Sequence, residues 1–377
     1  MLEFSFNFSR APSMPLNGRS MHAIHPYPAK FPGWLAKILL LRRAPKGSVI
    51  LDPFCGSGTT LLESNMLGMH AVGVDVNALS CLISKVKATP LGRVQISQIG
   101  KLTRQLEHVA IPVSSCWLAD AEQKIPALRH WFQDNVAAET AMLTARINEV
   151  EDIAVRDFLR VSLSAIIVRA SNQESDTRYA AINKSIQDGG VIRLFLKKVT
   201  ENIERVQKDS VHMTCASVGV HNADSRDLSF LSDESFDLVL TSPPYANSYD
   251  YYLYHKFRCL WLGLDFKFAQ SKEIGSRREF SSLKRSPHKW QEDMLLCLRE
   301  IYRVLKPGGA AFLIVGDSVI AGQKIPGDEL TMGLAKKAGF AVDGVWSAEQ
   351  AGHSRAFNPA FAQRGKKEHL IYIQKNA

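Results

Sequence analysis

The sequence predicts an α/β protein with a doubly wound, mostly parallel sheet of seven strands and a helical insertion. Two observations support this fold class. Residues 48–75 read as a short apolar strand, a glycine turn, a helix and a second strand, which together form one βαβ unit. The strand rhythm then stops near residue 91 and returns after residue 211, and the stretch between places apolar residues at helical spacing.

Five further apolar runs of strand length complete the expected sheet, at residues 217–222, 236–241, 310–315, 341–346 and 369–373. A helical pattern at residues 291–305 separates two of these runs, and it ends at the helix-stopping sequence Lys306-Pro307-Gly308-Gly309. Strands that alternate with helices favour a parallel sheet covered on both faces.

The helical insertion shows its clearest periodicity at residues 153–170 and 191–206. We therefore expect two units along the chain. Residues 1–90 and 212–377 carry the sheet, and residues 91–211 form the insertion.

The composition excludes several classes of protein. A net charge of +9 and a pI near 9.2 favour a polyanionic partner. No apolar stretch approaches the roughly 18–20 residues that cross a bilayer, and residues 1–15 lack the layout of a signal peptide, so we expect a cytoplasmic protein without a membrane partner. The six cysteines lack the paired spacing of zinc ligands or of a disulfide framework, so no metal is expected.

The turn from Asp52 to Thr60, with the sequence DPFCGSGTT, joins the first strand to its helix. Glycines at such a turn let the backbone approach a ligand and aim free N–H groups at negative charge. The third glycine of the nicotinamide fingerprint GxGxxG is missing, because Thr60 or Leu61 stands near where it should be. This difference disfavours a dehydrogenase.

Two acidic residues follow predicted strands. Asp75 lies 17 residues after Gly58, close to the spacing of about 20 at which a carboxylate accepts hydrogen bonds from ribose hydroxyls. Asp224 follows the next strand, where it is expected either to reach an adenine amino group or to cap a turn. The ligand of this edge should therefore contain a ribose.

The tetrapeptide Ser242-Pro243-Pro244-Tyr245 leaves the carboxyl end of an apolar strand, where open α/β sheets place their active sites. The prolines fix the backbone and remove N–H donors, so carbonyl oxygens are left to face outward. We expect Ser242 Oγ and the Pro243 carbonyl to accept hydrogen bonds from an amino group on an aromatic ring. Tyr245 would then stack on a base rotated out of a duplex.

Together these motifs resemble the amino-directed DNA methyltransferases of bacterial and phage restriction-modification systems, whose signatures are DPFxGSGTT and [S/D/N]PP[Y/F]. The resemblance covers residues 21–90 and 218–375. It implies a Rossmann-like class I methyltransferase fold, S-adenosyl-L-methionine as methyl donor and double-stranded DNA as substrate. A cognate restriction endonuclease is a further partner that this resemblance suggests.

The segment His25-Pro26-Tyr27-Pro28-Ala29-Lys30-Phe31-Pro32 looks like the part of this family that closes over the methionine end of the cofactor. The resemblance therefore implies cofactor contacts by Lys30 and Phe31. Beside Asp75 and Asp224, it implies the same role for Asp52, Phe54, Gly56, Gly58, Thr59, Thr60 and Thr241.

Within that family, a serine or threonine before SPPY is commoner among cytosine-N4 enzymes, whereas adenine-N6 enzymes usually have Asp or Asn in place of the serine. Thr241-Ser242 therefore favours cytosine N4, with adenine N6 and an amino group of RNA or protein as alternatives. A cytosine-C5 enzyme would need a Pro-Cys pair, and the sequence contains none.

Contact with DNA has three candidate regions, and the insertion is the first. The second is the basic segment 267–289, expected to be a mobile loop, with Arg277, Arg278, Lys284 and Arg285; the third is the run 353–367 with Arg355, Arg364, Lys366 and Lys367. Such residues would mostly contact phosphates. The tyrosine-rich stretch 249–254 is expected either to line the base pocket or to pack in the core.

Overall fold

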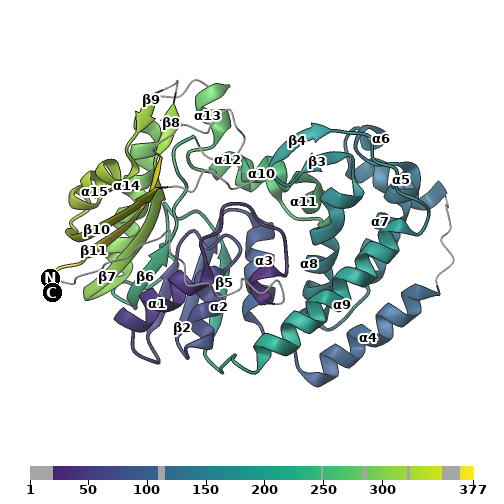
Figure 1. The fold of residues 1–377 in the computed structure, drawn as a ribbon, viewed down its shortest axis with the longest axis horizontal. Coiled ribbons are helices and arrows are strands. Elements are labelled where there is room, and N and C mark those ends of the chain that lie inside the picture. The colour runs from purple at the N-terminus through teal and green to yellow at the C-terminus, as the bar shows by residue number, and fades with distance from the viewer. Residues whose placement is uncertain (1–19, 109–114, 248, 283–286, 321–322, 350–365) are drawn as a thin grey trace.

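The computed structural model describes residues 20–108, 115–247, 249–282, 287–320, 323–349 and 366–377. Its central sheet has seven strands, as predicted (Figure 1). Their spatial order is β10 (Ala341–Glu349), β11 (Lys367–Gln374), β7 (Leu305–Gly316), β6 (Phe236–Thr241), β1 (Val49–Asp52), β2 (His70–Asp75) and β5 (Val218–Asn222).

The strands from β7 to β5 are all parallel, whereas β11 runs antiparallel to both of its neighbours, β7 and the edge strand β10. The prediction of a mostly parallel sheet is therefore confirmed. Because β1, β2, β6 and β5 run in the same direction, their carboxyl ends meet at one edge, which is where such sheets place their sites.

Both faces of the sheet are covered, because alternate residues of each strand point to opposite sides. On β6, Leu238 and Leu240 pack against α1 (Gly33–Arg43), whereas Val239 packs in the cluster formed with α14 (Pro287–Val304) and α15 (Gly327–Lys337). Two more helices, α2 (Thr59–Met66) and α3 (Ala78–Ala88), flank β2.

The predicted insertion is helical and lies beside α3 (Figure 1). It contains a small hairpin, β3 (Gln173–Ser175) with β4 (Arg178–Ala181), which sequence reasoning did not predict. Its helices are α4 (Arg93–Glu107), α5 (Ser115–Lys124), α6 (Leu128–Trp131), α7 (Asp134–Asn148), α8 (Ile153–Ala170) and α9 (Gly190–Ser210).

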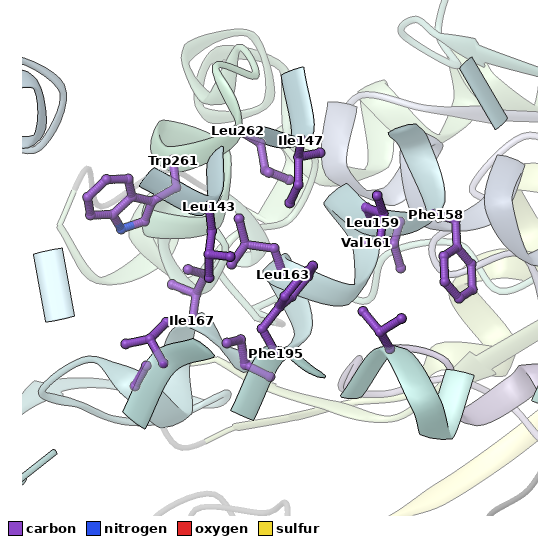
Figure 2. Close-up of a cluster of buried hydrophobic side chains, with 14 of the residues drawn as sticks. Leu143, Ile147, Phe158, Leu159, Val161, Leu163, Ile167, Phe195, Trp261 and Leu262 are labelled. Carbon is purple, nitrogen blue, oxygen red and sulfur yellow. The ribbon is translucent and has the colours of Figure 1, made fainter. Parts of the chain in front are cut away.

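One apolar core joins the insertion to the rest of the chain. Phe158 and Leu163 of α8 and Phe195 of α9 belong to the same buried cluster as Ile83 of α3 and Trp261 of α11 (Lys256–Leu262) (Figure 2). Burial of side chains this large contributes roughly 1.5–3 kcal/mol each. The insertion is therefore packed firmly against the sheet-bearing part of the chain.

The remaining elements are short and lie near the carboxyl edge of the sheet or beside it. They are η1 (Met21–Ala23), α10 (Tyr251–Tyr254), α12 (Phe266–Lys272), α13 (Arg277–Ser281), β8 (Ser318–Ile320) and β9 (Gln323–Ile325). Across the described residues, no helix combines the length and the apolar character needed to cross a membrane.

The prediction of a mobile loop at residues 267–289 is wrong, because α12, α13 and the start of α14 occupy most of this segment. Asp265 caps α12 by accepting hydrogen bonds from the backbone N–H groups of Lys267 and Phe268. The many turn-forming residues of this segment mark helix ends and not one long loop. Lys284 and Arg285 lie outside the described residues, as do Arg355 and Arg364.

Candidate active site

The two signature motifs meet in space because β1 and β6 are neighbours in the sheet, with Leu51 opposite Val239. Thr241 Oγ1 donates a hydrogen bond of 2.6 Å to Asp52 Oδ1, and Thr60 Oγ1 donates one of 3.0 Å to the Leu240 carbonyl. All three polar side chains are buried. The glycine loop and the proline turn are therefore fastened to each other at the carboxyl edge of the sheet.

The glycine loop has the left-handed backbone that its sequence requires, with φ of 48° at Gly56 and 76° at Gly58. A Cβ at Gly58 would lie 2.9 Å from Ser84 Cα, so α3 can pack against the loop only because a glycine stands there. Gly56 N–H donates to Asp75 Oδ2 at 2.9 Å. This hydrogen bond joins the loop to the acidic residue at the end of β2.

The proline turn presents oxygen acceptors, as expected. Ser242 Oγ donates to the Ile314 carbonyl at 3.0 Å, and the same hydroxyl is hydrogen-bonded to the Tyr245 side chain. Trp290 Nε1 donates to the Pro244 carbonyl at 3.0 Å. Within the described part of the chain, the Pro243 carbonyl accepts no hydrogen bond.

Tyr245 packs against the end of β7. A Cβ at Gly316 would lie 2.6 Å from Tyr245 Cε2, so the ring uses the space that this glycine leaves. Burial raises the pKa of the Tyr245 hydroxyl, which therefore stays protonated at neutral pH.

Tyr27 covers the glycine loop, although sequence reasoning named its neighbours Lys30 and Phe31. Its ring lies 3.5 Å from the position of a Cβ on Gly56, its hydroxyl is 2.8 Å from Ser80 Oγ, and its ring stacks on Tyr251 at 5.8 Å. The position of Tyr27 as an aromatic residue between two prolines of the same motif was the sequence signal that could have identified it.

Lys30 and Phe31 point elsewhere. Lys30 Nζ donates to the His22 carbonyl at 2.5 Å, and Phe31 packs against the core between α1 and the sheet. Their proposed cofactor contacts stay predictions.

The family model described as DNA methylase matches residues 7–85 and 236–373, which is more than half of the chain. The chain belongs to the N6/N4 DNA methylase family. It is therefore an S-adenosylmethionine-dependent DNA methyltransferase. The unmatched residues 86–235 include the whole helical insertion.

Among curated proteins, this methylase is 25% identical to the type II methyltransferase M.MvaI of Kocuria varians, over 84% of this chain and 81% of that protein. It is 23% identical to M.BsoBI of Geobacillus stearothermophilus, over 81% and 75%. Among solved structures, the rRNA methyltransferase aviRa of Streptomyces viridochromogenes aligns with a TM-score of 0.37 at 14% identity, over 97% of this chain and 95% of that one.

The edge around Asp75 fits the cofactor of this methylase family. Burial raises the pKa of the Asp75 carboxyl to about 6, and its Oδ1 accepts only from the Asn77 backbone at 2.8 Å among the described contacts. Two buried polar atoms nearby, Asn77 Nδ2 and Glu273 Oε2, have no partner in the described structure. Desolvated acceptors and an unused donor suit a ligand with hydroxyl and amino groups.

The tyrosines that follow the proline turn differ in their surroundings. Tyr252 and Tyr254 are buried, whereas Tyr251 faces the space beside Tyr27. The Tyr251 backbone N–H donates to Glu273 Oε1 at 2.8 Å. Burial, followed by the nearby charge of Asp250, raises the pKa of Glu273 well above its usual range.

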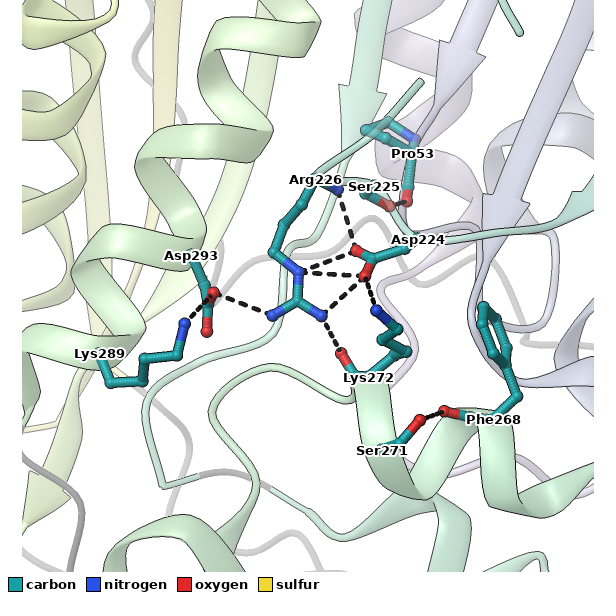
Figure 3. Close-up of polar contacts among 9 residues, drawn as sticks. All are labelled: Pro53, Asp224, Ser225, Arg226, Phe268, Ser271, Lys272, Lys289 and Asp293. Carbon is teal, nitrogen blue, oxygen red and sulfur yellow. Dashed lines mark hydrogen bonds and ion pairs between the residues drawn. The ribbon is translucent and has the colours of Figure 1, made fainter. Parts of the chain in front are cut away.

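Asp224 of the methylase lies in a charge network between β5 and α14 (Figure 3). Arg226 Nε and Nη2 donate hydrogen bonds of 2.7–3.1 Å to the Asp224 carboxylate, and Arg226 Nη1 donates one of 2.9 Å to Asp293. Lys272 Nζ lies 3.8 Å from Asp224, and Lys289 Nζ lies 2.6 Å from Asp293. The predicted contact of Asp224 with an adenine amino group stays a prediction.

Asp317, Asp328 and His369 are the one group in the described residues whose potential metal-ligand atoms lie within 4.8 Å of one another. The Asp317 carboxylate is already used, because it accepts from Gly327 N–H, Lys367 N–H and Lys324 Nζ and lies 3.1 Å from His369 Nε2. Since Asp317 directly follows Gly316, this cluster fixes the turn on which Tyr245 packs.

Proposed function

We propose that this methylase transfers a methyl group to the exocyclic N4 of cytosine in double-stranded DNA. The supporting observation is the hydrogen bond from Ser242 Oγ to the Ile314 carbonyl. While the hydroxyl proton is donated to that carbonyl, Ser242 Oγ would accept a hydrogen bond from a substrate amino group. The preceding Thr241 favours cytosine within the family.

The chemistry requires an amino group whose lone pair is freed from the ring. Bound S-adenosylmethionine would supply the electrophilic methyl group. Ser242 Oγ and the Pro243 carbonyl would accept the two N4 hydrogens and draw them out of the base plane, so that the lone pair faces the methyl group. Such preorganised acceptors act by positioning and electrostatics.

Tyr245 would hold the target base after it leaves the duplex. The protonated phenol keeps an apolar face for stacking, and Gly316 fixes the ring position. Stacking on an aromatic residue offsets part of the few kcal/mol that unstacking a base costs.

On the cofactor side, we propose that Asp75 accepts from the ribose hydroxyls and that the loop from Phe54 to Thr60 lies against the methionine end. Asp52 and Thr241 would connect this loop to the proline turn, since they are hydrogen-bonded to each other. The Tyr27 ring would cover the glycine loop.

We propose that residues 1–90 and 212–377 form the catalytic unit and that the insertion, residues 91–211, contacts DNA. Arg277 and Arg278 on α13 follow the proline turn and would contact phosphates beside the target base. Two relatives are named as type II methyltransferases, so we also propose a cognate restriction endonuclease as a functional partner.

The test is to methylate DNA with the purified protein, digest it to nucleosides and identify the product by mass spectrometry. N4-methylcytosine is the expected product. N6-methyladenine would contradict the base assignment and leave the amino chemistry intact. RNA and protein substrates serve as parallel controls, and labelling of either one in preference to DNA would refute the substrate class.

A further inference from the structure

A cavity of about 350 Å³ lies between the segment before α1 and the insertion helices α8 and α9. Its apolar wall comes from Ile166 of α8 and Leu194 of α9. Its polar wall carries four cationic side chains and one acidic side chain: Lys30, Arg169, Lys197, Lys198 and Glu201. Three separate elements thus bring positive charge to one cavity.

The positive charge of this cavity is poorly compensated. Glu201 is shared, because its Oε2 lies 3.7 Å from Lys198 Nζ and 3.6 Å from Arg205 Nη1. Neither Arg169 nor Lys197 has an ion-pair partner among the residues the structure describes. Within the residues that the structure describes, Lys30 Nζ donates only to the His22 backbone carbonyl.

Burial disfavours the charged form of two lysines of this cavity. Burial, followed by the charge of Arg205, lowers the pKa of Lys198 to about 8, and burial lowers the pKa of Lys30. An anion in the cavity would offset both effects, since an opposite charge within a few ångströms favours the charged form of a lysine. The geometry and the electrostatics thus indicate an anionic ligand.

The cavity is close to the proposed active site. His25, Pro26 and Lys30 line it, and Tyr27 of the same short segment covers the glycine loop. Tyr27 and Lys30 are three positions apart in the sequence, a span of at most about 11 Å. The ring of Tyr27 also lies 5.2 Å from that of His255, just beyond the tyrosine-rich stretch. A ligand in the cavity would therefore lie beside the cofactor loop and the base pocket.

We propose that this cavity binds a backbone phosphate of the DNA strand that carries the target base, an inference that rests on the proposed action on DNA. Arg169 can hold two phosphate oxygens with its planar fork, and the lysines add point charges. Ile166 and Leu194 would contact the apolar face of the adjoining sugar. Because Lys30 shares a segment with Tyr27, phosphate binding would also fix the segment that covers the cofactor loop.

The experiment compares the wild type with the double variant Arg169→Ala/Lys197→Ala in binding to a duplex oligonucleotide over a series of salt concentrations. We expect the affinity at low salt to fall at least about tenfold and the slope of log K against log salt to decrease in magnitude by about 1, because one phosphate contact is lost. Affinity for S-adenosylmethionine should not change, since neither residue touches the glycine loop.

Two variants control for charge and for folding. Lys336→Ala/Lys337→Ala removes two exposed cations from the last turn of α15, which packs on the other part of the sheet, and it should leave the salt slope unchanged. Arg169→Lys/Lys197→Arg keeps the charge and should keep most of the slope.

A second arm distinguishes the source of the phosphate. The wild type is titrated with inorganic phosphate and with a nucleoside triphosphate. We expect neither to show saturable binding that is present in the wild type and lost in the double variant. If such binding appears while DNA affinity and slope stay at the wild-type values, a small phosphate ligand replaces DNA. If the wild type methylates DNA and the double variant keeps both affinity and slope, the phosphate site is refuted although the proposed function stands. A wild type without DNA affinity would refute both.

Discussion

Thr241 Oγ1 lies 2.6 Å from Asp52 Oδ1, and both side chains are buried at the boundary between β6 and β1. The two residues are 189 positions apart in the sequence: Asp52 begins the glycine-loop motif, and Thr241 directly precedes the proline turn. Because the strands are parallel neighbours, this hydrogen bond, together with that from Thr60 Oγ1 to the Leu240 carbonyl, fixes the proline turn relative to the glycine loop. Its loss should be visible in both stability and catalysis.

Thr241→Val should therefore destabilise the protein in a pH-dependent way. Burial raises the pKa of Asp52 to about 6, above the value near 3.8 of the unfolded chain, so ionising this group costs stability as pH rises from 4 to 6. A pKa shift of one unit corresponds to about 1.36 kcal/mol, so the cost of ionising Asp52 in the folded protein reaches roughly 3 kcal/mol above pH 6. Removing the Thr241 donor adds roughly 1–3 kcal/mol to that cost. Denaturant unfolding at pH 5 and pH 8 should show the larger loss at pH 8; an equal loss at both values would contradict this account.

Cofactor binding should depend on the ionisation of Asp75. With a pKa of about 6, this carboxyl is largely protonated at pH 5 and ionised at pH 8, and ribose hydroxyls donate best to the ionised form. Calorimetric titration with S-adenosylmethionine should show an affinity that is constant above pH 7. Below pH 6, the affinity should weaken by up to about tenfold for each pH unit. Asp75→Asn, which cannot ionise, should bind more weakly and without this pH dependence. A wild-type affinity that is constant from pH 5 to pH 8 would exclude the role.

The sequence was sufficient for the fold because local signals and global topology agree. The β6 strand and the α8 helix have the predicted bounds, since apolar alternation and helical periodicity are strong there. The meeting of the DPF loop with the SPPY turn also followed, because parallel strands end at a common edge.

Long-range polar contacts could not be predicted in the same way. Glu139 in α7 is fully buried and accepts hydrogen bonds from the backbone N–H groups of Gly189, Val191 and Ile192 at the start of α9. A glutamate within a helix gives no sign of a partner 50 residues away. Tyr27 did carry a sequence signal, its place between Pro26 and Pro28, but its neighbours Lys30 and Phe31 were predicted to contact the cofactor instead.

Gly316→Ala should impair catalysis without unfolding the sheet. A Cβ there would lie 2.6 Å from the Tyr245 ring, so the ring must shift away from its stacking position. Misplacement of a base-holding residue by about 1 Å can cost up to a hundredfold in rate, and we expect kcat to fall at least about tenfold with cofactor affinity unchanged. Gly333→Ala is the matched control, because a Cβ at that helical position meets no atom within 4 Å. Equal turnover by the two variants would disprove the role of the glycine.

Ser242→Ala should lower turnover through the loss of one acceptor, while Ser242→Thr should keep part of it because the hydroxyl remains. We expect the alanine variant to lose at least about tenfold in kcat, or about 1.4 kcal/mol of transition-state stabilisation, with S-adenosylmethionine binding intact. Single-turnover methyl transfer to a duplex measures the step directly. Wild-type rates in the alanine variant would remove Ser242 from the proposed mechanism.

Arg226→Ala should destabilise the fold more than its surface position suggests. The side chain joins Asp224 to Asp293, and Asp293 is only 1% exposed. Removing the guanidinium leaves a buried carboxylate with Lys289 as its remaining ion-pair partner, and breaking a buried pair costs about 3 kcal/mol or more. Asp293→Asn should restore part of that loss in the Arg226→Ala background, because the amide removes the uncompensated charge. Urea unfolding of the two single variants and the double variant gives the coupling energy; additive losses would show that the two residues act independently.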